Sequence, residues 1–186
     1  MIDKSAVNEF DTEVLGRQAR TLAEIAVGLL KSHGLKITFV ESCTGGLLSK
    51  LITDVSGSSA VFECGIVSYS NRIKIGVLGV GQDTINRYTQ VSEQTALEMA
   101  RRACALSAAD IGVSTTGASG PGGEANVQAG VSYFAICHGQ YSTCTLLDVS
   151  EKKLSREQNR LYTAKCALKS ICDYVEKISE TGGNYE

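Results

Sequence analysis

The sequence predicts a single α/β domain, folded as a three-layer α/β/α sandwich around a mixed sheet. Segments with helical periodicity alternate with short apolar strands along residues 11–178. The 186 residues are enough for one well-filled α/β domain and too few for two ordinary ones. Two strands near the C-terminal end are close enough to pair as a hairpin, which adds antiparallel strands to parallel ones. We expect residues 1–10 and 179–186 to be flexible tails.

The first half of the chain supplies helices and parallel strands. Residues 11–33 have apolar side chains at helical spacing, and Gly34 is a helix stop. Residues 35–41 form an apolar strand that leads into a serine- and glycine-containing turn. The remaining elements of this half are a helix from about 44 to 53, a β-rich run at 61–69, and helices near 71–78 and 82–88.

The second half adds two helices and the antiparallel strands. Ser92 is a suitable N-cap for a helix over 92–108, and Ser155 with Gln158 matches a capping box that opens a helix over 155–178. Between the two helices we predict a buried strand at 111–116 and a hairpin whose strands are 131–137 and 141–149.

Composition and charge exclude several classes of function. The net charge is −2 without a basic stripe, which argues against a nucleic-acid partner. The seven cysteines show no C-x-x-C pair, so we expect reduced thiols. Neither a secretory leader nor a membrane-length apolar run is visible, so we expect a cytoplasmic protein without a membrane partner. Nothing suggests a metal site or another cofactor.

Ser42 is the first candidate catalytic residue. It follows the strand at 35–41, at the carboxyl end where open α/β sheets bind ligands. The backbone N–H groups of Cys43, Thr44, Gly45 and Gly46 are available there for an oxyanion or a phosphate. Two alternatives stay open: Ser42 or Thr44 is only an N-cap, or Cys43 is the nucleophile.

Lys74 and Tyr69 are candidates for activating this serine. A lysine becomes a base when burial lowers its pKa, and a tyrosine hydroxyl can hydrogen-bond either partner. The alternative is a surface lysine beside a tyrosine packed at a strand end. The two histidines, His33 and His138, have no evident acid partner, so a Ser–His–Asp triad is not expected.

A glycine-rich loop after the strand at 111–116 is a candidate for ligand binding. Such a loop lets the backbone approach a phosphate or ribose closely, and hydroxyls add donors. Its candidate binding residues are Thr116, Gly117, Ala118, Ser119 and Gly120. Arg156 and Arg160, in the first turns of the last helix, either reach an anionic ligand or are solvated surface charges.

Several motifs in order resemble one family. They are Glu41-Ser42-Cys43-Thr44-Gly45-Gly46, Gly57-Ser58-Ser59, Val67-Ser68-Tyr69-Ser70-Asn71 with Lys74, Val91-Ser92-Glu93, and Thr116-Gly117-Ala118-Ser119-Gly120-Pro121-Gly122-Gly123. Over roughly residues 15–175 the series resembles the CinA C-terminal domain family, the nicotinamide mononucleotide deamidases. The companion N-terminal domain of longer members is not seen, so the chain resembles the stand-alone form.

The resemblance implies an amidohydrolase of pyridine-nucleotide salvage that converts nicotinamide mononucleotide and water to nicotinate mononucleotide and ammonia without a metal. By motif match, Ser42 is the nucleophile, Lys74 the general base and Tyr69 an assisting group. The small-molecule nucleotide is the expected partner, and we expect the domain to self-associate. The phosphate would lie near the glycine loop and Arg156.

Two segments differ from the family pattern. Residues 124–130 replace a stretch that usually reaches Lys-Pro-Val-Gly, and Leu154-Ser155-Arg156 replaces Gly-Asp-Arg. Two further hypotheses therefore stand beside the first: a nucleotide-binding protein with weak or no turnover, and a Ser–Lys amidase with a different substrate.

Overall fold

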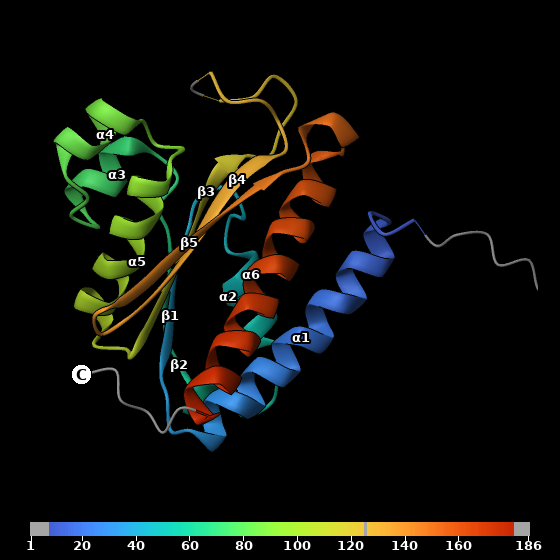
Figure 1. Cartoon of the computed structure of the whole chain (residues 1–186), viewed down its shortest axis with the longest axis vertical. Coiled ribbons are helices and arrows are strands. Elements are labelled where there is room, and N and C mark those ends of the chain that lie inside the picture. Colours follow the sequence, from blue (N-terminus) through green and yellow to red (C-terminus); the bar gives the residue numbers. More distant parts are fainter. Residues whose placement is uncertain (1–7, 125, 181–186) are drawn as a thin grey trace, which may run out of the picture.

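The computed structural model describes residues 8–124 and 126–180, and a five-stranded mixed sheet forms its middle layer (Figure 1). Strand β1 (Ile37–Glu41) pairs in parallel with both β2 (Phe62–Val67) and β3 (Ile111–Ala118). The antiparallel pairs are β3 with β4 (Val131–His138) and β4 with β5 (Tyr141–Asp148). The resulting order β2-β1-β3-β4-β5 is the mixed sheet that the sequence predicts.

Helices cover both faces of this sheet, as expected for a three-layer sandwich (Figure 1). One face carries the long pair α1 (Thr12–Ser32) and α6 (Arg156–Glu180), with α2 (Leu47–Thr53) beside them. On the other face lie α5 (Glu93–Ser107), α3 (Asn71–Gly76) and α4 (Gln82–Tyr88). Single 3₁₀ turns occupy Ser58–Ala60 and Ser150–Lys152.

Local capping chemistry sets the helix boundaries. The Ser92 hydroxyl accepts from the Thr95 N–H at the start of α5. Ser155 and Gln158 satisfy each other's backbone N–H groups in the predicted capping box before α6. The predicted helix from about residue 44 begins only at Leu47, because Gly45 and Gly46 have φ angles of +62° and +91°, which a right-handed helix does not accommodate.

The ends of the domain extend beyond the predicted boundaries. Phe10, which the sequence analysis assigns to the N-terminal tail, is buried, and its ring centroid lies 5.3 Å from that of Tyr162. Gln158 donates a hydrogen bond to the Phe10 carbonyl, so Phe10 is fixed on α6. Residues 1–7 and 181–186 of the predicted tails lie outside the described residues. Within the described part of the chain, no helix combines the length and the apolar character that a membrane crossing requires.

Candidate active site

Three serines meet at the carboxyl edge of the parallel strands. Ser42 follows β1, Ser68 follows β2 and Ser119 follows β3. Because parallel strands end at the same edge of a sheet, these residues become neighbours. The Ser42 N–H donates to the Thr115 carbonyl at 2.9 Å, and the Ser68 N–H donates to the Glu41 carbonyl at 2.8 Å. The sheet ladder thus continues one residue past the strands and fixes the backbone of Ser42.

Helix α3 places Lys74 over this edge. Its Nζ lies 3.0 Å from the Ser42 Oγ, 2.8 Å from the Ser68 carbonyl oxygen and 3.3 Å from the Tyr69 carbonyl oxygen. The side chain is fully buried, with 0% exposure, whereas Ser42 keeps 8%. The structure therefore brings together the serine and the lysine that the sequence analysis selects, although 32 residues separate them.

The surroundings of Lys74 favour the neutral amine. Burial lowers the pKa of Lys74 below its ordinary value of 10.5, because it removes water from the ammonium form, while the Glu124 carboxylate acts in the opposite direction. A neutral amine has two N–H bonds and one lone pair. Once Lys74 is deprotonated, the carbonyls of Ser68 and Tyr69 can accept both N–H bonds, and the lone pair can then take the proton of the Ser42 hydroxyl. This geometry suits a general base.

Cys43 is poorly placed to act as the nucleophile in place of Ser42. Burial raises the pKa of the Cys43 thiol to about 12, against weaker opposing hydrogen bonds from Thr115 and Ser119. Since the thiolate is the reactive form, this thiol is protonated and weakly reactive at neutral pH.

A buried carboxylate holds the turn that carries Ser42. Glu41 is 1% exposed and accepts four hydrogen bonds. The donors are the Thr44 hydroxyl (2.7 Å), the Leu48 N–H (3.1 Å), and the N–H and hydroxyl of Ser49 (2.8 and 2.7 Å). The carboxylate thus caps α2 from outside the helix and ties it to β1. The role of Glu41 is not predicted from the sequence, although a carboxylate at the end of a buried strand is a usable signal.

Arg160 supports the same turn from α6. Its Nε and Nη2 donate to the Thr44 carbonyl at 3.0 and 2.7 Å, and the guanidinium lies over Gly45, where a Cβ would come within 3.3 Å of Nη2. Arg160 is therefore not a free surface charge, and it does not line the cavity beside Ser42. It is a structural clamp between α6 and the turn.

A small cavity of about 80 Å³ opens beside Ser42. It is lined by Ser42, Cys43, Tyr69, Gly117, Ala118, Ser119, Gly120, Pro121, Gly123, Glu124 and Arg156. Tyr69 and Arg156 are both exposed, and Arg156 Nη2 donates to the Tyr69 hydroxyl at 2.7 Å. The tyrosine hydroxyl thus meets Arg156, and only the backbone carbonyl of Tyr69 contacts Lys74.

The other candidate binding residues divide into two groups. Cys43, Gly117, Ala118, Ser119, Gly120 and Arg156 line the cavity. Thr44, Gly45, Gly46 and Thr116 lie outside its lining. The Thr44 hydroxyl contacts Glu41 and Thr115, and the Thr116 hydroxyl donates to the Gln90 carbonyl. The hydrogen bond to Gln90 holds the Thr116 side chain away from the cavity.

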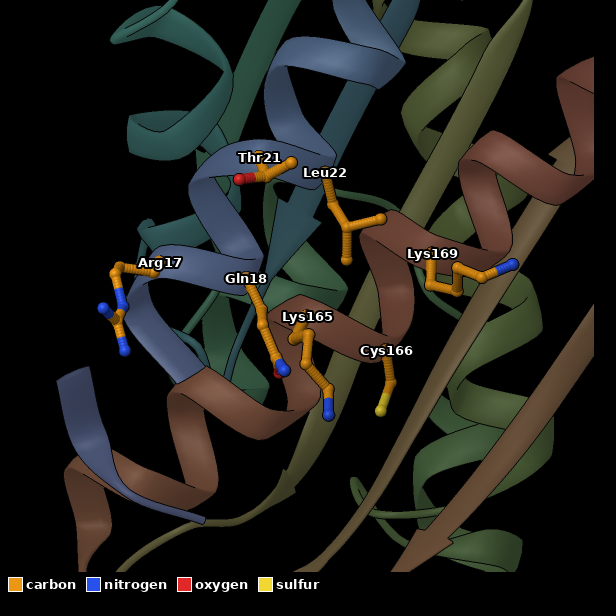
Figure 2. A pocket seen from close by; sticks show the side chains of 7 residues that line it. All are labelled: Arg17, Gln18, Thr21, Leu22, Lys165, Cys166 and Lys169. Atoms are coloured by element: carbon orange, nitrogen blue, oxygen red, sulfur yellow. The ribbon is translucent and has the colours of Figure 1, made fainter. Parts of the chain in front are cut away.

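A larger hollow of about 600 Å³ lies between α1 and α6 (Figure 2). Helix α1 contributes Arg17, Gln18, Thr21 and Leu22, and α6 contributes Lys165, Cys166 and Lys169. The hollow shares no lining residue with the cavity at Ser42. Its two lysines already have partners, since Lys165 lies over the Tyr162 ring and Lys169 pairs with Asp173. Volume alone therefore does not locate the reactive site of this molecule.

Fold and site together define an α/β protein with a buried serine–lysine pair at the carboxyl edge of its parallel strands. The family model of the CinA C-terminal domain matches residues 19–175. The chain belongs to the CinA C-terminal domain family, as its motifs indicate.

Relatives and solved structures agree with this assignment. A CinA-like protein of Amoebophilus asiaticus is 38% identical over 164 residues, which cover 88% of this chain and 38% of the relative. A putative competence-damage inducible protein of Caldicellulosiruptor saccharolyticus is 37% identical over 165 residues, again 88% of this chain and 38% of that protein. The chain thus spans about 38% of the length of these curated relatives.

Two crystal structures have the same fold. A CinA superfamily protein from Klebsiella pneumoniae matches with a TM-score of 0.81 at 26% identity, covering 86% of this chain and 98% of that one. The competence/damage inducible protein CihA from Agrobacterium tumefaciens matches with a TM-score of 0.79 at 34% identity, covering 86% and 96%.

Proposed function

We propose that this domain hydrolyses the carboxamide of nicotinamide mononucleotide, releasing nicotinate mononucleotide and ammonia. One observation carries the proposal: a fully buried lysine amine lies 3.0 Å from the hydroxyl of a serine that lines a cavity. A nucleophile within hydrogen-bond reach of a base with a lowered pKa is the arrangement that nucleophilic amide hydrolysis requires. The family motifs supply the choice of substrate.

The reaction divides into two half-reactions. Lys74 takes the proton of the Ser42 hydroxyl while Oγ attacks the carboxamide carbon. The C–N bond breaks, and the proton held by Lys74 leaves with the amine as ammonia. Water then attacks the acyl-enzyme ester, giving up a proton to Lys74, and the carboxylate product departs as Ser42 regains its proton.

Backbone donors beside Ser42 support an oxyanion site. The Gly45 N–H is engaged by the Ser42 carbonyl at 3.2 Å. In the described part of the chain, the N–H groups of Cys43 and Thr44 donate to no backbone carbonyl. They directly follow the nucleophile, so they are our candidates for stabilising the negative charge on the carbonyl oxygen.

The charges around the cavity suit a zwitterionic ligand. Glu124 and Arg156 both line it and both are exposed. A nicotinamide nucleotide has a cationic ring and an anionic phosphate, so the carboxylate complements the ring and the guanidinium complements the phosphate. The cavity of about 80 Å³ is smaller than typical ligand pockets of about 300 Å³ or more. We therefore infer that the contact between Tyr69 and Arg156 opens when nucleotide binds.

Ammonia release from nicotinamide mononucleotide, measured with EDTA present, tests the proposal. We expect ammonia and nicotinate mononucleotide in equal amounts. Binding by calorimetry without product would instead indicate a nucleotide-binding protein. Turnover of other amides but not of this nucleotide would indicate a Ser–Lys amidase with a different substrate, and either result would overturn the proposal.

The pH dependence of turnover should report the lowered pKa of Lys74. The base form is the neutral amine, so kcat/KM is expected to rise with pH as the ammonium loses its proton. Because burial lowers this pKa, the rising limb should lie below pH 10.5. A profile of kcat/KM against pH for the free enzyme tests this. A limb centred at or above pH 10.5 would contradict it.

Replacing Arg156 by alanine is expected to weaken substrate binding more than chemistry. Loss of one charge-assisted hydrogen bond should raise KM by about 10- to 100-fold with a smaller effect on kcat. Steady-state kinetics on nicotinamide mononucleotide and on its nucleoside, which lacks the phosphate, measure the effect. The exposed Arg20→Ala variant is the matched control. An equal loss on both substrates would argue against a phosphate contact.

A further inference from the structure

A second pair of reactive groups lies on the α5 side of the sheet. Cys104 on α5 lies against Cys137 on β4: the Cys104 thiol donates to the Cys137 carbonyl oxygen at 3.7 Å and to the Asp110 carbonyl oxygen at 3.8 Å. Gly112 pairs with Cys137 in the sheet, and a Cβ added to Gly112 would lie 2.7 Å from the Cys104 Sγ. The missing side chain of Gly112 thus provides the space in which the Cys104 sulfur meets Cys137.

Both thiols line one cavity. It measures about 540 Å³ and is formed by Arg101, Cys104, Ala105, Ala109, Asp110, Cys137, His138 and Gly139. Cys137 is only 5% exposed, but the cavity gives a small reagent access to the pair. None of these residues lines the cavity at Ser42, so the pair is separate from the proposed catalytic machinery.

The two thiols have unequal surroundings. The neighbouring Cys104 thiol lowers the pKa of Cys137, burial opposes this, and the guanidinium of Arg101 lowers it further. The neighbouring Cys137 thiol and burial raise the pKa of Cys104. By contrast, burial and then Glu93 raise the pKa of Cys144 to about 12, and no cation among the described residues offsets them. A cation beside one thiol, with a second cysteine lining the same cavity, is the setting of an attacking and a resolving cysteine.

We propose that Cys104 and Cys137 form a redox-responsive dithiol, which hydrogen peroxide converts to an intramolecular disulfide. The Cys137 thiolate attacks one peroxide oxygen, the O–O bond breaks, and hydroxide leaves, giving a sulfenic acid. The hydroxide takes up the proton that the Cys137 thiol lost on ionising, which makes the first water. The Cys104 sulfur then attacks the oxidised sulfur, an S–S bond forms, the S–O bond breaks, and a second water is released. Each sulfur is oxidised by one electron overall, and the peroxide is reduced to two waters.

The disulfide would fasten α5 to β4. The two cysteines are 33 residues apart, so the new bond would close a loop that contains the whole of β3. Helix α5 also packs on β3, where the Ser114 hydroxyl donates to the Ala96 carbonyl at 2.6 Å. Oxidation would therefore lock the layer of the sandwich opposite to α1 and α6.

Treatment of the folded protein with hydrogen peroxide, followed by alkylation and mass spectrometry, tests the proposal. We expect intact protein to lose the mass of two hydrogen atoms and peptide mapping to link Cys104 to Cys137. During peroxide treatment, the fraction of Cys104 and Cys137 that can still be alkylated should fall at least about tenfold faster than that of Cys144. The reason is the larger thiolate fraction of the pair. A thiol reductant should restore both free thiols.

Single variants assign the two roles. In Cys104→Ser, we expect a sulfenic acid that dimedone traps on Cys137, whereas Cys137→Ser should give no adduct at Cys104. Cys144→Ser is the matched control and should form the disulfide like the parent protein. Equal alkylation of Cys104 and Cys137 before and after peroxide, in the parent protein itself, would overturn the proposal. A disulfide between other cysteines would do the same.

Discussion

Replacing Ser42 by alanine is expected to abolish ammonia release from nicotinamide mononucleotide, lowering kcat by ~10⁴-fold or more. The substitution removes the only hydroxyl that contacts the Lys74 amine among the described residues, at 3.0 Å, and so removes the nucleophile. Lys74→Met should lower kcat by about 10²- to 10⁴-fold, because the serine then has no group to take its proton. Since the two residues act as one unit, the double variant should be no slower than Ser42→Ala alone.

Kinetics of the three variants measure these effects beside two matched controls. Ser56→Ala and Lys152→Met change exposed residues and should keep parental rates. Thermal unfolding of every variant separates lost chemistry from lost structure. If Ser42→Ala kept normal ammonia release while folded, the serine would not be the nucleophile and the proposed mechanism would fail.

The second large effect is expected at Glu41, on stability. Glu41→Gln keeps the shape of the side chain but removes its charge and points an amide NH₂ at groups that are themselves donors. The carboxylate now satisfies four such donors inside the protein. Breaking this buried arrangement should lower the free energy of unfolding by about 3 kcal/mol, since hydrogen bonds to a charged group are worth about 1.5–3 kcal/mol each and are not additive.

Urea denaturation of Glu41→Gln beside Glu63→Gln tests this expectation. The Glu63 side chain is 45% exposed and, among the described residues, pairs only with Lys36, at 3.8 Å, so its loss should change stability by no more than about 0.5 kcal/mol. We also expect Glu41→Gln to slow turnover, because the turn it releases carries Ser42. Equal stability of the two variants would show that the Glu41 carboxylate does not hold the turn.

Local patterns predicted the secondary structure well, and the exceptions have local causes. Ser92 and the pair Ser155 and Gln158 cap their helices as the sequence indicates, because capping depends on residues only three positions apart. The late start of α2 follows from two glycines with positive φ angles. The local sequence places Phe10 in a tail. Its burial is not predicted, because it depends on Tyr162, which lies far along the chain on α6.

The chemistry of the site was readable only in part. Ser42 and Lys74 were selected by residue type and by family motif, and the roles of both stay predictions. Arg160 looked equivalent to Arg156, one helical turn earlier, yet the structure uses them differently. Arg156 faces the cavity and Tyr69, whereas Arg160 donates to the Thr44 carbonyl. Helical spacing cannot distinguish the roles of Arg156 and Arg160, because these roles depend on the residues that pack against each side chain.

The sequence by itself determined the order of helices and strands, the mixed sheet and the family, since periodicity, caps and motifs are properties of short segments. The tertiary structure alone decided which side chains meet. Parallel pairing of β1, β2 and β3 places Ser42 beside the backbone of Ser68 and Tyr69, and α3 then buries Lys74 against all three. The packing of α5 on β4 likewise joins Cys104 to Cys137. Contacts of this kind depend on strand order and register, and on the absence of a side chain at Gly112, which no local pattern records.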